Sequence, residues 1–204
     1  MTSINTLFLD IGGVLLTNGW GKEARKLATE NFSLNYSDTE ERHHLSYSIY
    51  EEGKLTLEEY LRRIVFFQER SFTMEQFRDF MFSQSCDHPE MIDLVKELKA
   101  RYNLKIAVVN NEARELNEYR ISKFGLNKFV DFYISSCFVH IRKPDADIFR
   151  VALDIAQVSP SSVAYLEDRE MFTDVASELG IRSIHHKDFK STTAELASLG
   201  LVIK

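Results

Sequence analysis

The sequence predicts an α/β fold in which a doubly wound parallel sheet carries helices on both faces. Short apolar segments alternate with segments of helical length, which is the pattern of such folds. The expected strands are 7–9, 104–109, 132–134, 163–166 and 182–184. No strand pattern occurs between the first two, where helix-start signals follow one another instead. We therefore expect a small helical cap over residues 18–86, inserted into a core formed by 1–17 and 87–204.

The first expected strand ends at a carboxylate. Leu7–Leu9 is followed by Asp10 and then by Gly12 and Gly13. A buried strand that stops in this way places Asp10 at the carboxyl edge of the sheet, where open α/β folds bind ligands. An exposed aspartate before an ordinary glycine turn explains this segment equally well. The residues at the ends of the other strands distinguish a ligand-binding Asp10 from an exposed one.

The segment after Asn18 has the signals of several helices. Capping-box spacing occurs three times, and a further helix is expected over 21–31. The three pairs are Ser37 with Glu40, Thr56 with Glu59, and Thr73 with Gln76. The many aromatic residues of this segment recur at helical spacing, which favours packing inside the cap over ligand contact. Trp20 is expected either to overhang the site or to pack within the cap.

The rest of the chain alternates helix and strand. Proline suits the first turn of a helix, and glycine commonly ends one. The expected helices run from Pro89 to Tyr102, up to Phe124 before Gly125, from Lys143 to about Gln157, up to Gly180, and up to Gly200.

Polar residues follow three of the expected strands. Asp10 follows the first, Asn110 and Asn111 the second, and Glu167 and Asp168 the fourth. The carboxyl ends of parallel strands face one crevice, so these groups should converge there.

Lys143, at an expected loop-to-helix boundary, lies on the same side. Carboxylates suit a hard cation such as Mg²⁺. Asp10 would then be placed for in-line attack on phosphorus, with the metal and Lys143 neutralising the developing charge. The constellation predicts phosphoryl transfer.

Four segments in this order resemble the motifs of the haloacid dehalogenase-like (HAD) hydrolases. They are LFLDIGGVL, IAVVNNE, RKPDADIF and YLEDREMFTDVASELG. The segment EGKLTLEEY, which begins at Glu52, is similar to part of the small helical cap of one branch of that family. The resemblance implies a Rossmann-like core, a Mg²⁺ cofactor and hydrolysis of a small phosphorylated substrate through an aspartyl phosphate. It implies catalytic roles for Asp10 and Lys143, phosphate binding by Asn110, Asn111 and Lys143, and metal binding by Asp10, the Gly12 carbonyl, Glu167 and Asp168.

The chain departs from this family pattern at three positions. Gly12 stands where family phosphatases usually have an aspartate that protonates the leaving group, so slow turnover is expected. Asn110 replaces a serine or threonine, and its amide can still donate to phosphate. Phe172 stands where a polar residue is frequent, and loss of such a contact typically costs 10–100-fold in metal affinity or activity. His140 is either a substitute acid or a plain loop residue.

Other polar residues have simpler interpretations. Asn111 is also a candidate helix cap, and Glu112 suits the dipole at the start of the following helix. The adjacent pairs His43–His44 and His185–His186 diverge along their elements and are expected at the surface.

The composition limits the kinds of partner that the protein can bind and the compartment in which it is expected. The net charge of −6 gives no field to hold nucleic acid or an anionic membrane. No apolar run reaches the roughly 20 residues of a membrane helix, and Asp10 interrupts what could be a secretory leader. The two cysteines, Cys86 and Cys137, lack metal-type spacing and suggest free thiols in a reducing compartment. We expect a cytoplasmic protein, and its oligomeric state is left open.

Four functions are compatible with these residues. A magnesium-dependent phosphatase leads. A catalytically degenerate relative that binds a phosphorylated ligand or a protein partner is the alternative that Gly12 and Phe172 favour. The helical insertion argues against a phospho-accepting receiver domain, and the acidic pair Glu167–Asp168 argues against a metal-independent dehalogenase.

Overall fold

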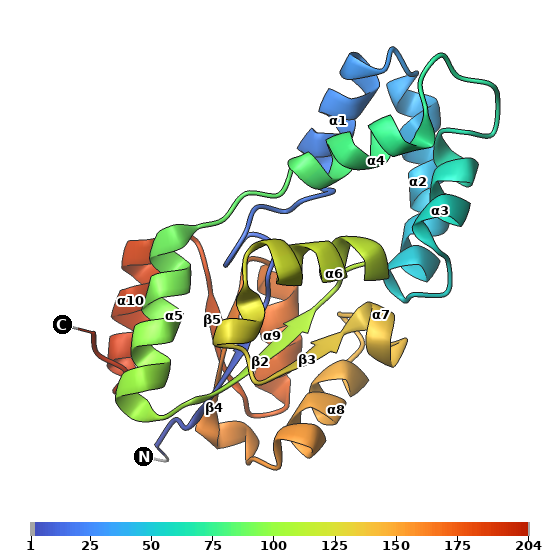
Figure 1. Ribbon diagram of the computed structural model, residues 1–204. Coiled ribbons are helices and arrows are strands. Elements are labelled where there is room, and N and C mark those ends of the chain that lie inside the picture. Colours follow the sequence, from blue (N-terminus) through green and yellow to red (C-terminus); the bar gives the residue numbers. More distant parts are fainter. Residues whose placement is uncertain (1–2, 204) are drawn as a thin grey trace.

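A sheet of five parallel strands forms the centre of the computed structural model, which describes residues 3–203 (Figure 1). The strands are β1 (Thr6–Leu9), β2 (Lys105–Asn110), β3 (Phe132–Ser135), β4 (Val163–Glu167) and β5 (Arg182–His185). Their order across the sheet is β3-β2-β1-β4-β5, and every neighbouring pair is parallel. The predicted doubly wound α/β fold is confirmed.

Helices cover both faces of the sheet because alternate strand residues point to opposite sides. Leu7 and Leu9 pack into a cluster with residues of α5 (Pro89–Tyr102) and α10 (Phe189–Ser198). Phe8, between them, packs into a second cluster with residues of α8 (Asp147–Ala156) and α9 (Glu170–Glu178). The β1 side chains are all buried, as expected for a central strand covered on both faces.

The short elements of the core differ in part from the prediction. α6 (Arg114–Lys123) ends just before Phe124, as expected. The one-turn helix α7 (Ser136–Val139) directly follows β3 and carried no sequence signal. α8 begins at Asp147 instead of Lys143, because a residue before proline disfavours helical backbone. Two 3-10 turns, Leu126–Lys128 and Pro160–Ser162, complete the core.

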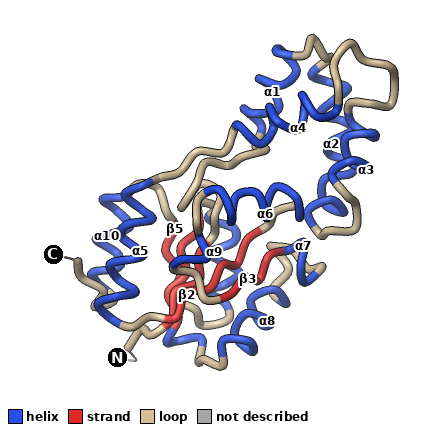
Figure 2. Tube along the Cα trace, viewed as in Figure 1, coloured by secondary structure: helices blue, strands red, loops and turns tan. Residues whose placement is uncertain are grey.

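Four helices form the cap, and all of them fall within the predicted segment 18–86. They are α1 (Lys22–Asn31), α2 (Tyr36–Glu51), α3 (Leu57–Ile64) and α4 (Met74–Ser83). Figure 2 shows strands only in the core. The cap is built around an aromatic cluster that includes Trp20, Tyr60 and Phe77, and Leu116 of α6 packs into the same cluster. The prediction that these aromatic residues pack inside the cap is confirmed.

Two of the three predicted capping boxes are present. Thr56 and Thr73 each exchange side-chain and backbone hydrogen bonds with the residue three positions on. The prediction at Ser37 was wrong, because Asn35 caps α2 by accepting from the Asp38 N–H. Glu40 instead forms an ion pair of 2.5 Å with Arg25 of α1.

The chain enters and leaves the cap through two segments that lie side by side. The Thr17 N–H donates to the Cys86 carbonyl at 2.9 Å, and the Cys86 N–H donates to the Thr17 hydroxyl at 3.0 Å. Leu16 and Asp87 form an antiparallel bridge next to them. At the other end of the cap, the Ser136 hydroxyl of α7 donates to the Glu51 carbonyl at 2.6 Å. Hydrogen bonds thus join the cap to the core at both of its ends.

Among the described residues, no helix combines the length and the apolar character that crossing a bilayer requires.

Candidate active site

Three carboxylates meet at the carboxyl edge of the sheet, as the strand ends predicted. Asp10 follows β1 directly, and its N–H donates to the Leu166 carbonyl at 2.9 Å, which extends the ladder to β4. Glu167 ends β4 and Asp168 follows it. These two and Asp10 each offer an oxygen within 4.8 Å of the others. Asp10 and Glu167 are buried, so their charges require compensation.

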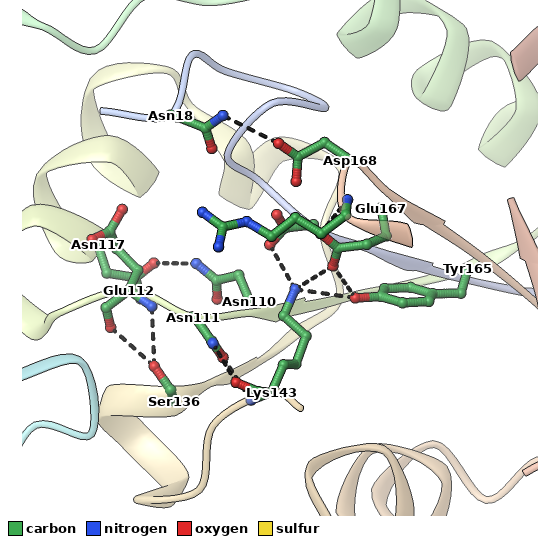
Figure 3. A network of polar contacts seen from close by, with 12 residues as sticks. Asn18, Asn110, Asn111, Glu112, Asn117, Ser136, Lys143, Tyr165, Glu167 and Asp168 are labelled. Carbon is green, nitrogen blue, oxygen red and sulfur yellow. Dashed lines mark hydrogen bonds and ion pairs between the residues drawn. The ribbon is translucent and has the colours of Figure 1, made fainter. Parts of the chain in front are cut away.

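Lys143 supplies part of that compensation. Its buried ammonium lies 3.1 Å from Asp10 Oδ1 and 2.5 Å from Glu167 Oε2, and it also contacts the Tyr165 hydroxyl at 3.1 Å (Figure 3). Burial lowers the pKa of Lys143, but the two carboxylates outweigh burial and raise it above its ordinary value. Burial and the Asp168 charge raise the pKa of Asp10, while Lys143 opposes them. Lys143 is therefore a fixed cation beside Asp10.

The residues present fit a divalent cation. When all three carboxylates are ionised, they and the one ammonium have an excess of two negative charges, and a bound divalent cation would neutralise that excess. Asp168 Oδ1 is buried without a hydrogen-bond partner. Oxygen donors of this kind are those that Mg²⁺ prefers. Burial, together with the Asp10 charge, raises the pKa of Glu167 to about 8.

The glycine loop after β1 reaches close to Asp168. Gly13 has φ +73°, and a Cβ there would lie 2.2 Å from Asp168 Oδ2, so only glycine fits. Gly12 is different, because its φ lies outside the left-handed region. A Cβ on Gly12 would meet Asn18 Oδ1 at 2.8 Å. Asn18 thus stands beside the corner that the missing aspartate would occupy.

Asn18 also holds Asp168. Its Nδ2 donates to Asp168 Oδ2 at 3.1 Å, a contact between residues 150 positions apart in the chain (Figure 3). Asn18 was not predicted as a site residue, because a lone polar residue at a loop carries no periodic signal. Its position shows that it orients one of the candidate metal ligands.

We expect Asn18→Ala to weaken magnesium binding by about tenfold or more, because residues that orient metal ligands typically contribute 10–100-fold. Isothermal calorimetry with Mg²⁺ measures this, and thermal unfolding of the same variant checks that the fold is unchanged. Asn5→Ala, far from the site at the amino end of β1, is the matched control. An unchanged magnesium affinity would show that Asp168 needs no help from Asn18.

The asparagine that ends β2 and the one that follows it have different surroundings. Asn110 is buried, and its Nδ2 donates to Asn117 Oδ1 at 3.1 Å while its own Oδ1 has no partner. The side chain of Asn111 exchanges two hydrogen bonds of 2.8 Å with the backbone of Lys143. Asn111 therefore positions the loop that carries Lys143. Phosphate binding by Asn111 stays a prediction, and it would use the backbone N–H of this residue. Asn111 does not cap α6, since the residue at the N-cap is Ala113.

Glu112 has a larger role than the predicted one. Its carboxylate accepts from the Ala113 N–H at 3.2 Å, in keeping with a helix start, but it also pairs with the buried Arg120 at 2.6 Å. Arg120 in turn donates to the carbonyl of Thr17 at the base of the cap. Burial raises the pKa of Glu112 to about 7 against the effect of Arg120. This pair, which carried no spacing signal, ties α6 to the cap entrance.

The predictions made for the histidines agree only in part with the structure. His43 is buried, contrary to the prediction, because its Nδ1 contacts the Tyr60 hydroxyl at 2.7 Å inside the cap. Burial lowers its pKa to about 3. His140 Nδ1 contacts the Glu52 carbonyl at 2.6 Å, and the residue is absent from the lining of the pocket described below. In this position, His140 connects α7 to the cap and does not reach the pocket as a substitute acid would.

The remaining histidines are less buried. His44 is exposed, as predicted, and His185 and His186 are half-buried. His185 Nε2 contacts the Asp168 carbonyl at 3.1 Å.

A pocket of about 470 Å³ lies between the cap and the core, with Asp10 and Lys143 in its lining. Trp20 lines it and also donates to the Tyr60 hydroxyl at 2.9 Å, so both expectations for this residue hold. Phe172 lines it too, with its ring centroid 5.1 Å from the Lys143 ammonium. The aromatic ring thereby replaces a polar contact by a cation–π contact.

Comparisons with known proteins agree with this geometry. Residues 4–177 match the hydrolase family described as haloacid dehalogenase-like hydrolase. Among curated proteins, bifunctional epoxide hydrolase 2 of Sus scrofa is 22% identical over 216 residues, covering 95% of this chain and 38% of that protein. Haloacid dehalogenase-like hydrolase domain-containing protein 3 of Mus musculus is 42% identical over 65 residues, covering 32% of this chain and 26% of that protein. The chain thus spans well under half the length of these relatives.

Solved structures share the fold. A HAD family enzyme of Bacteroides thetaiotaomicron has a TM-score of 0.79 at 21% identity, covering 94% of this chain and 98% of that one. The same enzyme in complex with magnesium and inorganic phosphate has a TM-score of 0.77 at 20% identity, covering 93% and 99%. L-2-haloacid dehalogenase of Xanthobacter autotrophicus has a TM-score of 0.63 at 15% identity, covering 98% and 85%. With a family match that takes in β1, the cap and β4, this chain belongs to the haloacid dehalogenase-like hydrolases.

Proposed function

We propose that this hydrolase is a magnesium-dependent phosphatase that acts on small phosphorylated metabolites through an aspartyl phosphate at Asp10. The observation that carries the proposal is the buried Asp10 carboxylate, 3.1 Å from the Lys143 ammonium and grouped with Glu167 and Asp168. The related Bacteroides enzyme was solved with magnesium and inorganic phosphate, which supports the same ligands here.

The chemistry follows from the placement of these groups. An oxygen of Asp10 attacks phosphorus, the bond to the leaving oxygen breaks, and the alcohol departs with a proton from solvent. Water then attacks the phosphorus of the aspartyl phosphate, which releases inorganic phosphate and restores Asp10. Lys143 stabilises the negative charge that develops on the phosphoryl oxygens. The first step is slow because Gly12 provides no acid for the leaving group.

Asp10, Asp168 and the Gly12 carbonyl would hold the magnesium ion. When bound, the ion would neutralise phosphoryl oxygens and orient them for in-line displacement. Glu167 has less freedom for metal binding, since its Oε2 pairs with Lys143 and accepts from the Tyr165 hydroxyl. We propose that Glu167 chiefly keeps Lys143 in place.

We expect beryllium fluoride, which imitates an aspartyl phosphate, to bind in the presence of magnesium even if turnover is slow. The complex needs only Asp10, Lys143, the phosphate-binding amides and the metal. Calorimetry with and without Mg²⁺ measures the binding, and Asp154→Asn, an exposed aspartate on α8, is the control that keeps it. A folded, magnesium-loaded protein that fails to bind beryllium fluoride would contradict a phosphoryl site.

A second candidate function is a binding protein for phosphorylated ligands that does not turn them over. Gly12 favours it, because the position lacks an acid. A phosphatase screen over sugar phosphates, nucleotides and other small phosphoesters, with and without magnesium, separates the two functions. Hydrolysis that requires magnesium supports the phosphatase, and binding with no hydrolysis of any compound supports the binding protein.

A further inference from the structure

The pocket between cap and core has a cationic lining. The chain carries a net charge of −6, yet six cationic side chains line this one pocket. They are Lys22, Arg25, Arg120, Arg142, Lys143 and Arg169. Positive charge is therefore concentrated where a substrate would enter.

Four of the six cations already have carboxylate partners. The ion pairs are Arg25–Glu40 at 2.5 Å, Arg120–Glu112 at 2.6 Å, Arg142–Glu51 at 2.7 Å, and Lys143 with Asp10 and Glu167 at 3.1 and 2.5 Å. Five carboxylates face these four cations, so the four leave little positive charge for a ligand beyond the phosphoryl group itself.

Arg169 and Lys22 are the remaining two. Within residues 3–203, neither side chain has an ion pair or a hydrogen bond. Arg169 lies at the N-cap of α9, on the core side next to Asp168, and Lys22 begins α1 on the cap side. The Arg169 guanidinium lies 5.7 Å from the Phe172 ring centroid, another lining residue.

The charge of Arg169 acts on Glu51, which lines the pocket on the cap side. Burial raises the pKa of Glu51 at the end of α2, and the charges of Arg142 and Arg169 both lower it. Of the two guanidiniums, only that of Arg142 forms an ion pair with Glu51. Within residues 3–203, the Arg169 guanidinium therefore has no ion-pair partner at this wall of the pocket.

We propose that Arg169 and Lys22 form a second anion subsite, so that preferred substrates are phosphomonoesters with a further anionic group remote from the transferred phosphoryl group. This inference rests on the proposed phosphatase function. The further group is a carboxylate or a second phosphate, both of which guanidinium binds through two parallel hydrogen bonds. A pocket of about 470 Å³ accommodates a metabolite of this size.

Two matched pairs of compounds test the subsite. Glycerol phosphate and phosphoglycerate differ by one carboxylate, and fructose monophosphate and bisphosphate differ by one phosphate. Binding to the Asp10→Asn protein with Mg²⁺ is measured by calorimetry, and hydrolysis by the unmodified protein is measured as phosphate release. In at least one pair, we expect the more anionic member to bind about tenfold more tightly, and the pair that responds identifies the group.

Variants assign that preference to the two residues. Arg169→Gln and Lys22→Gln should each reduce the preference severalfold, and together they should remove it. Arg101→Gln, an exposed arginine on α5, and Lys26→Gln, one helical turn after Lys22, remove the same charges outside the pocket and should keep it. Raising the ionic strength should weaken the preference in the unmodified protein.

The outcomes separate this inference from the proposed function. Equal binding of both members in both pairs, or a preference that survives the double variant, overturns the subsite even if hydrolysis is found. A tenfold preference in binding with no hydrolysis of any compound keeps the subsite and overturns the phosphatase. Failure of every compound to bind to the folded, magnesium-loaded protein overturns both.

Discussion

Asp10→Asn is expected to abolish phosphate release from every substrate of the protein. The amide has nearly the same shape as the carboxylate but is not a nucleophile, and losing a covalent nucleophile costs enzymes up to about 10⁶-fold. We expect a loss of at least 10⁴-fold, measured as phosphate release with saturating Mg²⁺.

Controls for this substitution come from the same cluster. The amide oxygen of the variant would still accept a hydrogen bond from Lys143, so the buried ammonium keeps partners and the unfolding temperature should change little. The conservative Asp154→Asn substitution, at an exposed position, should keep full activity. Residual activity above about 0.01 per cent in Asp10→Asn would mean that a different group attacks phosphorus.

Gly12→Asp combined with Asn18→Ala is expected to raise turnover by about 10²–10⁴-fold, the usual contribution of general acid–base catalysis. The backbone at Gly12 permits a side chain, because its φ lies outside the left-handed region. Space is the obstacle, since a Cβ would come within 2.8 Å of Asn18 Oδ1. Removing the Asn18 amide clears that corner, so the double variant should exceed Gly12→Asp alone. The measurement is kcat for a generic phosphoester with a good assay signal.

The comparison has to be made against Asn18→Ala, which isolates the contribution of the new carboxylate. Magnesium must be saturating, because Asn18 supports Asp168 through its 3.1 Å hydrogen bond. A double variant that folds, binds magnesium and is no faster than Asn18→Ala would show that the missing acid does not limit the rate. Asn110 and Phe172 would then account for slow turnover, and the binding-protein function would be favoured.

The part of the site that was predictable from the sequence is the part that regular structure positions. Asp10, Asn110 and Glu167 lie at the ends of strands, and parallel strands bring their ends to one edge whatever the loops do. Lys143 was predicted from its place at an expected loop-to-helix boundary and from its motif, and neither of these reveals its partners. The lysine is held by the Asn111 side chain and by Glu167.

Contacts between irregular segments were not predictable. Asn18 and Asp168 come together because two loops pack, and no periodicity links residues so far apart. His43 looked like half of a surface pair, yet its side chain is buried against Tyr60 because α2 turns that face toward α3. Local sequence gives the position of a helix better than the direction in which each side chain points.

The pairing of Leu16 with Asp87 has a consequence for the entropy of the chain. A turn of a few residues could join these positions and leave the strand order unchanged, so the cap is in effect one long loop of the core. Loop-closure entropy grows only logarithmically, by about 0.6 kcal/mol for each doubling of length, so a loop roughly sixteen times longer costs roughly 2 kcal/mol. Because the cap buries an aromatic cluster within itself and against α6, that modest cost is readily offset. An open sheet of this kind can therefore accept a whole helical unit at one loop without losing its central strand pairing.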